Sequence, residues 1–247
     1  MTETPVPGPV PRFELARWRD EFGVVAGITG RGGGEPPFDL GLAGTHTPVE
    51  RVMGHWRNFQ QSFPGFDGVV VARQVHGTEI RWQGPSQGLL IQDDADGHGT
   101  GSPRLLLGVT VADCIPVYLV DPGERLVALV HAGWRGVAGG ILPLAVELLR
   151  AKGSHVENVL VHCGVGICGG CYEVGPEVFA ACGLDPPPAG KGELDLRALL
   201  THQALMAGVV HISTSPFCSS HDQDRFFSHR GSGGKDGRGV AFLGLLG

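Results

Sequence analysis

The feature that most constrains the fold is a series of short, apolar, β-branched runs, each closed by a turn. The clearest example is the stretch 104–131, where RLLLGVTV and RLVALVH flank PVYLVDPG, which ends in a turn at Asp121-Pro122-Gly123. Short runs of this kind between turn residues are typical of buried strands. The 41 glycines and 18 prolines of the chain indicate many turns and few long helices.

Strand and helix patterns alternate irregularly along the rest of the chain. We expect helices over 49–63 and 139–153 and in the segments PEVFAAC and DLRALLTHQALMAG. Further strands are expected at 22–29, 158–165, VVHIST and GVAFLGLL, with 68–76 and 78–83 forming a hairpin that turns at His76-Gly77. The segment QDDADGHGTGS is expected to be a polar loop. This order predicts an α/β (α+β) fold, a single mixed-sheet domain with flanking helices.

Length and composition set the domain organisation and exclude some partners. The Pro-rich start, residues 1–12, is expected to be a flexible tail, and residues 13–247 one domain. The net charge of −6 argues against nucleic-acid binding. No early run resembles a signal peptide and none reaches membrane-spanning length, so we expect no membrane contact and a cytoplasmic location. The six cysteines are then reduced, and serve as core residues, ligands or nucleophiles.

Three side chains that bind metals lie at or near the ends of apolar runs. His76 lies in RQVHGT, Cys114 follows an acid in ADC, and His131 opens HAGWRG. Two imidazole nitrogens and one thiolate suit Zn²⁺ and leave its fourth position open for water or substrate. From spacing alone, such residues are more often packing or surface residues, since a buried Cys behaves as a small hydrophobic residue. Cys168 and Cys171 form one CxxC pair without a second, so we do not expect a zinc ribbon or an iron–sulfur site there.

Several motifs together resemble those of a known family. RQVHGT, VADC-x-P-V, HAGWRG, YEVGPEV, FFS-x-R and GRG occur in the order typical of the YfiH/LACC1 family, from about Gly27 to the C-terminus. The older name of this family is the multicopper polyphenol oxidoreductase, or laccase-domain, family. This chain departs from the usual pattern in three places: Val111 stands where the family has Thr, Asp39 where it has Asn, and Arg57 lies one position out of register in HWRN.

The resemblance implies a fold, a metal and a reaction. The fold is an α/β one shared with some cysteine hydrolases. One zinc ion per chain is implied at His76, Cys114 and His131, with Cu²⁺ as a second candidate. The implied activity is phosphorolysis of purine nucleosides such as adenosine, inosine and methylthioadenosine, with an adenosine deaminase side activity. Purine nucleosides and phosphate would be the substrates.

Phosphate needs fixed cationic donors, and the planar fork of Arg suits its oxygens best. Arg135 lies in the glycine-rich turn four residues after His131, and is our strongest candidate. Asp113, beside Cys114, could orient a ligand or act as an acid or base, or could be only a turn carboxylate. The other substrate-binding candidates are Arg31, Arg57, Arg230 and Arg238.

Two other enzymatic functions and one non-enzymatic function are the alternatives. Cys114 could be the nucleophile of a thiol hydrolase with His131 as its base. A copper-binding polyphenol oxidoreductase is a second alternative, because Cu²⁺ competes with Zn²⁺ for such ligands. However, the 11 histidines are scattered and contain no H-x-H pair, which disfavours a multicopper centre. A non-enzymatic partner-binding domain fits least well, since it does not explain the converging thiol, imidazoles and arginines.

Overall fold

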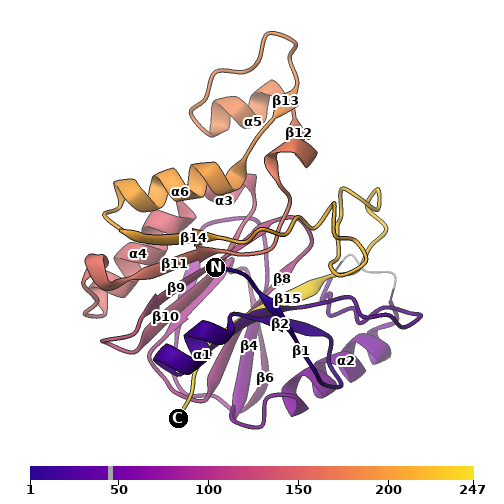
Figure 1. Cartoon of the computed structure of the whole chain (residues 1–247), viewed down its shortest axis with the longest axis vertical. Coiled ribbons are helices and arrows are strands. Elements are labelled where there is room, and N and C mark those ends of the chain that lie inside the picture. The colour runs from indigo at the N-terminus through magenta and orange to yellow at the C-terminus, as the bar shows by residue number, and fades with distance from the viewer. Residues whose placement is uncertain (44–46) are drawn as a thin grey trace.

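Two large mixed sheets pack face to face in the structure, a computed structural model that describes residues 1–43 and 47–247 (Figure 1). The first sheet has seven strands, in the order β1 (Thr4–Val6), β2 (Arg12–Glu14), β3 (Val24–Thr29), β15 (Gly239–Leu245), β8 (Leu105–Val111), β4 (Gly68–Arg73) and β6 (Gly88–Asp93). The second has six, in the order β14 (His211–Thr214), β11 (Leu160–Cys163), β9 (Ile115–Asp121), β10 (Leu126–Ala132), β7 (Gly97–Thr100) and β5 (Ile80–Gln83).

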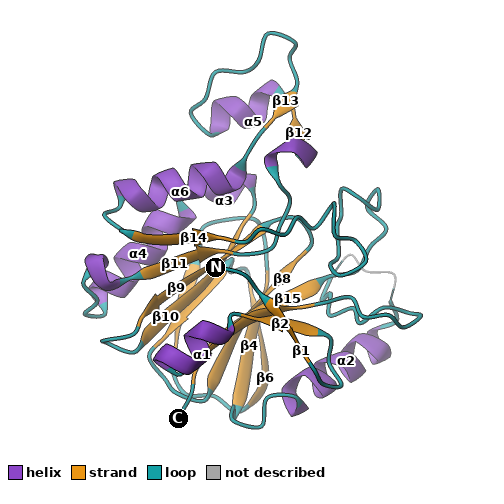
Figure 2. Ribbon diagram, in the orientation of Figure 1, coloured by secondary structure: helices purple, strands orange, loops and turns teal. Residues whose placement is uncertain are grey.

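Helices cover the outer faces of both sheets. Those over the second sheet are α3 (Trp134–Ala138), α4 (Ile141–Ala151) and α6 (Leu196–Met206), and α2 (Val49–Gln61) lies over the first sheet (Figure 1). The other helical elements are α1 (Ala16–Phe22), α5 (Pro176–Ala181) and the short turns η1 (Val156–Asn158) and η2 (Gly169–Cys171). A small pair, β12 (Glu173–Val174) and β13 (Gly192–Glu193), projects with α5 at one end (Figure 2). None of the described helices is long and apolar enough to cross a membrane.

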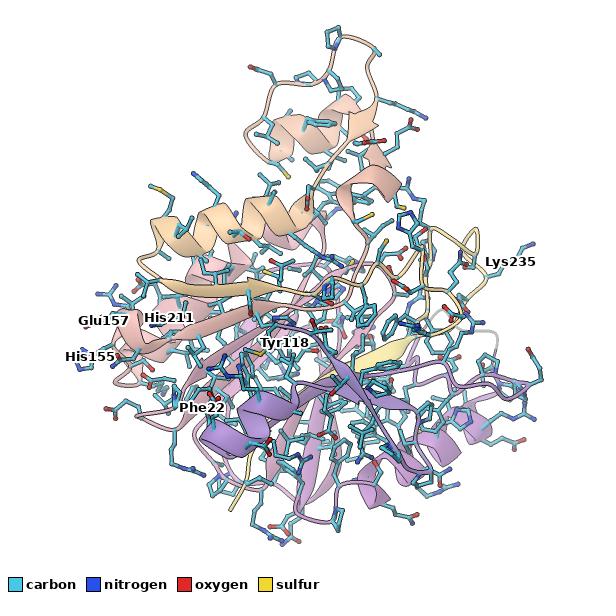
Figure 3. All side chains as sticks on the ribbon, viewed as in Figure 1. Phe22, Tyr118, His155, Glu157, His211 and Lys235 are labelled. Carbon is cyan, nitrogen blue, oxygen red and sulfur yellow. The ribbon has the colours of Figure 1, made fainter. Side chains whose placement is uncertain are left out.

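The apolar runs are continuous because the central strands are buried on both faces. Side chains alternate along β9: Ile115 and Val117 face the helices, whereas Tyr118 faces the other sheet. The Tyr118 hydroxyl donates a 2.8 Å hydrogen bond to the Gly27 carbonyl of β3, which links the two sheets inside the core. Figure 3 shows Tyr118 near the centre of the molecule.

The α/β class with flanking helices is confirmed, but two local expectations were wrong. The segments 68–76 and 78–83 are not a hairpin, because β4 pairs within the first sheet and β5 within the second. The turn between them, with His76 at φ 59°, therefore carries the chain from one sheet to the other. The expected polar loop contains β7, which is fully buried because it pairs with β10 on one side and β5 on the other.

The first 12 residues are not a free tail. Strand β1 pairs antiparallel with β2, so this segment forms the edge of the first sheet. The buried Glu3 carboxylate accepts hydrogen bonds from His162 (3.1 Å to Nε2) and from the Ser215 hydroxyl (2.8 Å). A Pro-rich composition concealed these contacts, since they depend on strands distant in the sequence.

We predict that Glu3→Ala lowers the free energy of unfolding by about 1–3 kcal/mol, because it leaves the buried His162 ring nitrogen without its partner. Chemical denaturation measures this change. Glu157→Ala, which alters an exposed carboxylate, serves as control and should change stability by less than about 0.5 kcal/mol. Equal effects of the two changes would contradict the packing of the N-terminal segment.

Candidate active site

The three expected metal-binding residues come together where turns of both sheets meet. His76 lies in the turn after β4, Cys114 in the turn between β8 and β9, and His131 in β10. Their ligand atoms all lie within 4.8 Å of one another, and the two imidazole rings are nearly perpendicular (82°) at 4.9 Å between centroids. The donor set of one thiol and two imidazoles therefore fits a metal ion held by three protein ligands.

Gly133 explains the glycine that follows His131 in the HAGWRG motif. A Cβ atom at this position would lie 3.0 Å from the Cys114 sulfur and 3.1 Å from the His76 ring. Any larger residue would thus push against two of the three ligands. The backbone must approach the site closely, and only glycine permits this without displacement.

A buried carboxylate, Asp96, orients both histidines. Its Oδ1 lies 3.0 Å from the His131 ring nitrogen Nδ1 and accepts a 3.0 Å hydrogen bond from the His76 backbone N–H. Its Oδ2 accepts a 2.6 Å hydrogen bond from the Gly77 N–H. These contacts leave Nε2 of His131 for the site and hold the left-handed turn at His76. Sequence reasoning missed Asp96, because nothing local distinguishes it from Asp93 and Asp94.

Electrostatics favour a charged Cys114–His131 pair. Burial opposes ionisation of the Cys114 thiol, but His131 and His76 outweigh burial and lower its pKa to about 6. Burial likewise disfavours the His131 imidazolium, but Cys114 and Asp96 outweigh it and raise that pKa to about 9. Between these two values the thiolate form of Cys114 predominates, and the thiolate is the form that binds metals or attacks substrates.

Asp113 is tied to the last loops of the chain. It adopts a positive φ of 90°, and its carboxylate accepts hydrogen bonds from the Ser219 and Ser228 hydroxyls (2.7 Å each) and from the Arg230 N–H (2.6 Å). Three donors therefore occupy the carboxylate. This arrangement favours a role in fixing the turn that carries Cys114 over the transfer of a proton.

The three ligands open onto a cavity of about 550 Å³, within the range of about 300–1,000 Å³ that is typical of small-molecule sites. Arg135, Arg230 and Arg238, three of the five arginines expected to bind substrate, line this cavity. The guanidinium of Arg135 lies 4.3 Å over the Trp134 ring and forms no ion pair with any described residue. Among the cavity arginines, Arg135 is thus the one whose side chain donates no hydrogen bond to a described residue, since Arg73, Arg230 and Arg238 each have such a partner.

Arg31 and Arg57 lie outside the cavity. Arg31 forms a 2.9 Å ion pair with Asp236 and stacks over Phe227, so a local carboxylate already satisfies its charge. Arg57 is exposed on α2. The structure does not bring these two arginines to the three ligands.

Sequence reasoning missed four other residues that line the cavity: Arg73, Gln74, Tyr172 and His229. The side-chain amide of Gln74 is fixed by the backbone of Thr110. Its Nε2 donates a 2.8 Å hydrogen bond to the Thr110 carbonyl, and its Oε1 accepts a 2.7 Å hydrogen bond from the Thr110 N–H. Tyr172 follows Cys171 and lies 5.3 Å beneath the guanidinium of Arg230. A signal for Tyr172 was available, since it opens the YEVGPEV motif.

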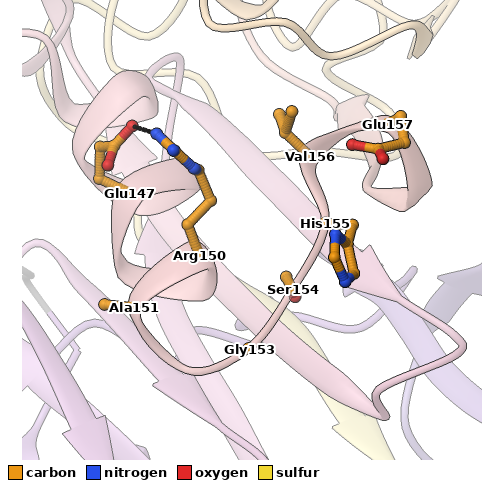
Figure 4. Close-up of a pocket in the computed structure, with 8 residues that line it drawn as sticks. All are labelled: Glu147, Arg150, Ala151, Gly153, Ser154, His155, Val156 and Glu157. Atoms are coloured by element: carbon orange, nitrogen blue, oxygen red, sulfur yellow. Dashed lines mark hydrogen bonds and ion pairs between the residues drawn. The ribbon is translucent and has the colours of Figure 1, made fainter.

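A separate hollow of about 620 Å³ lies at the end of α4 (Figure 4). Its lining carries the Glu147–Arg150 ion pair on one side and His155 on the other, and it contains no cysteine. His155 and Glu157 lie on the opposite side of the molecule from Lys235, whose loop borders the cavity of the three ligands (Figure 3). The larger hollow therefore lacks the thiol and the paired imidazoles that line the smaller cavity.

In metal-free protein, we predict that the Cys114 thiolate appears with a midpoint near pH 6 instead of its ordinary value of 9.0. The ultraviolet absorbance difference between the native chain and Cys114→Ser isolates this thiol from the others. Asp96→Asn should raise the midpoint, because it removes the carboxylate that keeps His131 charged. A native midpoint near 9 would contradict the charged pair.

Comparison with known proteins places the chain in a family. The family model described as multi-copper polyphenol oxidoreductase laccase matches residues 26–246. The purine nucleoside phosphorylase YlmD of Geobacillus stearothermophilus is 35% identical over 249 residues, which cover 90% of each chain. Its crystal structure matches 99% of this chain and all of its own (100%), with a TM-score of 0.87.

Two further relatives agree with this placement. The adenosine deaminase RL5, from an unknown prokaryotic organism, is 33% identical over 191 residues, which cover 70% of this chain and 73% of RL5. The crystal structure of YfiH from Bacillus licheniformis is 28% identical and covers 96% of this chain and 97% of its own, with a TM-score of 0.85. The chain belongs to the multi-copper polyphenol oxidoreductase laccase family, whose members include YfiH and YlmD.

Proposed function

We propose that the chain is a zinc-dependent purine nucleoside phosphorylase acting on adenosine, inosine and methylthioadenosine, with adenosine deaminase side activity. The observation that carries this proposal is the convergence of His76, Cys114 and His131 on a cavity that also presents the unpaired guanidinium of Arg135. The names of the relatives, purine nucleoside phosphorylase and adenosine deaminase, support the same reaction classes.

The three ligands suit one zinc ion and are too few for a multicopper centre. Two imidazoles and a thiolate are ordinary zinc ligands, and three of them leave one position for a substrate oxygen. When bound, the ion would act as a Lewis acid toward that oxygen. A multicopper oxidase needs several adjacent centres, whereas this cavity offers three ligands among residues 1–43 and 47–247. A single bound Cu²⁺, with dye oxidation as its consequence, remains the alternative.

Arg135 is the proposed phosphate-binding residue. Its guanidinium is held over Trp134, projects into the cavity and has no carboxylate partner in the described chain. By contrast, Arg73 is paired with Asp94 (2.9 Å) and Arg230 donates to the Glu173 carbonyl (2.8 Å). Arg135 can therefore form two parallel hydrogen bonds with phosphate without breaking an existing one.

The nucleoside would lie between the phosphate and the aromatic wall of the cavity. Tyr172 and Trp134 line the cavity and supply apolar ring edges beside a purine, since their faces lie under Arg230 and Arg135. Phosphorolysis forms a bond between a phosphate oxygen and C1′ and breaks the C1′–N9 bond, so that the base leaves with a proton. We assign the delivery of this proton to His229, which, among the residues that the structure describes, is the imidazole of the cavity outside the metal-binding group.

A thiol hydrolase is the second candidate, because the Cys114 thiolate and the His131 imidazolium form the pair that such enzymes use. The two functions differ in their need for metal and phosphate. We also propose a cytoplasmic location, which the six free thiols support.

The reaction is tested by incubating zinc-loaded protein with adenosine or inosine, with and without phosphate, and separating the products by chromatography. We predict that base and ribose 1-phosphate form only with phosphate. Cys114→Ala should lower the rate by more than about a hundredfold, since loss of even an outer-shell partner costs about 10–100-fold. Cys182→Ser, which changes a free thiol outside the cavity, is the matched control.

Three results of this assay would redirect the assignment. Full activity after chelation would favour the thiol hydrolase. Inosine formed from adenosine without phosphate would show deamination alone. Dye oxidation that rises with added copper, without base release, would favour the copper enzyme.

We predict that Arg135→Lys raises the KM for phosphate about ten- to hundredfold, because an ammonium cannot replace two parallel hydrogen bonds. The KM for the nucleoside should change much less. Arg57→Lys, on the exposed side of α2, is the control and should leave both constants unchanged. An unchanged KM for phosphate in Arg135→Lys would remove Arg135 from the anion site.

A further inference from the structure

A second group of metal-binding side chains lies outside the catalytic cavity. The ligand atoms of Cys168, Cys171, Cys218 and His221 all lie within 4.8 Å of one another. The Cys171 sulfur is 3.0 Å from Nε2 of His221, and the Cys168 sulfur is 4.0 Å from Nδ1 of the same ring. None of these residues lines the catalytic cavity, and all three cysteines are free thiols.

Two short turns present these four side chains. Cys168 and Cys171 bracket the turn η2, closed by a 3.1 Å hydrogen bond from the Cys171 N–H to the Cys168 carbonyl. Cys218 and His221 bracket an equivalent turn, closed by a 3.1 Å bond from the His221 N–H to the Cys218 carbonyl. The spacing is thus Cys-x2-Cys facing Cys-x2-His. This is the arrangement in which four ligands can surround one ion.

The backbone already supports negative charge on a sulfur at this place. The Cys168 N–H donates to the Cys218 sulfur at 3.3 Å. Gly166 forms an isolated β-bridge with Cys218, and its carbonyl accepts a 3.0 Å hydrogen bond from the Ser219 N–H. The two turns are therefore held in register by contacts that do not depend on a metal. Support of a ligand by its surroundings is characteristic of metal centres.

We propose that Cys168, Cys171, Cys218 and His221 bind a second zinc ion, which has a structural role. Three thiolates and one imidazole fill the tetrahedral coordination of Zn²⁺, so no position is left for a substrate. Binding releases the thiol protons and involves no electron transfer. The proposal does not depend on the proposed function, because it uses none of the residues of the catalytic cavity.

The second ion would fix one wall of the catalytic cavity. Tyr172, which lines the cavity, directly follows Cys171. Ser219, which directly follows Cys218, donates a 2.7 Å hydrogen bond to Asp113, the neighbour of Cys114. A metal that joins the two turns therefore holds Tyr172 and the support of Asp113 in fixed relative positions.

This inference departs from the expectation that the single CxxC pair forms no zinc ribbon or iron–sulfur site. The second pair is Cys-x2-His instead of Cys-x2-Cys, and it lies far along the chain after α6. Sequence spacing could not show that the two turns face each other. The expected zinc content rises from one ion per chain to two.

The test is the zinc content of reduced, zinc-supplemented protein, measured by native mass spectrometry and elemental analysis. We expect two ions in the native chain, one in Cys114→Ser, one in Cys171→Ser and none in the double variant. Cys182→Ser should keep both. One ion in the native chain that vanishes in Cys114→Ser would overturn the proposal, and so would a disulfide among the three cysteines in freshly purified protein.

Because Cys171→Ser could fail to fold, the exposed His221 supplies a second test. We expect His221→Cys to retain the ion as a four-thiolate site, and His221→Ala to lose it to a chelator that leaves the native site filled. Equal retention by His221→Ala and the native chain would overturn the assignment. In Cys114→Ser, chelation should also lower the thermal unfolding midpoint, since only the structural site remains; an unchanged midpoint would contradict a structural role.

Discussion

The cavity that His76, Cys114 and His131 line depends on the buried carboxylate of Asp96. The two carboxylate oxygens hold the backbone turn at His76 and the ring of His131. The backbone carbonyl of Asp96 also accepts a 2.7 Å hydrogen bond from the His131 backbone N–H. Two ligands that come from different sheets are thereby fixed against one side chain. The charge of the carboxylate also favours the imidazolium, which in turn favours the Cys114 thiolate. Asp96 therefore sets both the positions of the two histidines and the charges of the Cys114–His131 pair.

The rest of the site is made by turns that run between the two sheets. The chain reverses at Asp113 in a left-handed conformation that non-glycine residues rarely adopt. Three hydrogen bonds to its carboxylate stabilise that turn from loops near the C-terminus. The proposed zinc site at Cys168, Cys171, Cys218 and His221 would strengthen the same wall. In this account the sheets provide rigid support, and the chemistry lies in the connections.

Apolar periodicity and turn residues predicted the helices and strands whose formation depends on nearby residues. The helices α2 and α4 and the strands β8 and β10 follow from apolar periodicity and turn residues. The pairing of β7 could not be predicted, because its glycine-rich sequence gains its stability from burial between β5 and β10. The same holds for β1, whose place in the sheet depends on contacts of Glu3 with distant residues.

Residues of the site were likewise predictable where nearby sequence marks them, and not where distant contacts decide their role. His76, Cys114 and His131 were identifiable because strand ends and family motifs mark them, and the structure brings them together. The arginines were not separable by sequence, since an Arg in a glycine loop looks the same whether it lines a cavity or pairs with a carboxylate. Arg31 illustrates this, because its partner Asp236 lies about 200 residues away. Asp96 and His221 escaped notice because their partners are brought near by strand pairing between distant segments, of β7 with β10 and of β11 with β14.

We propose that the cavity directs phosphate, and not water, to C1′ of a purine nucleoside. This proposal is tested most directly by running the reaction in water enriched in the heavy oxygen isotope, with unlabelled phosphate, and weighing the products by mass spectrometry. With inosine as the substrate, which has no amino group to exchange for a labelled oxygen, we expect ribose 1-phosphate without label at C1′ and an unlabelled base, because the new sugar oxygen comes from phosphate. Free ribose in place of ribose 1-phosphate would show that water is the nucleophile, and would contradict direct phosphorolysis.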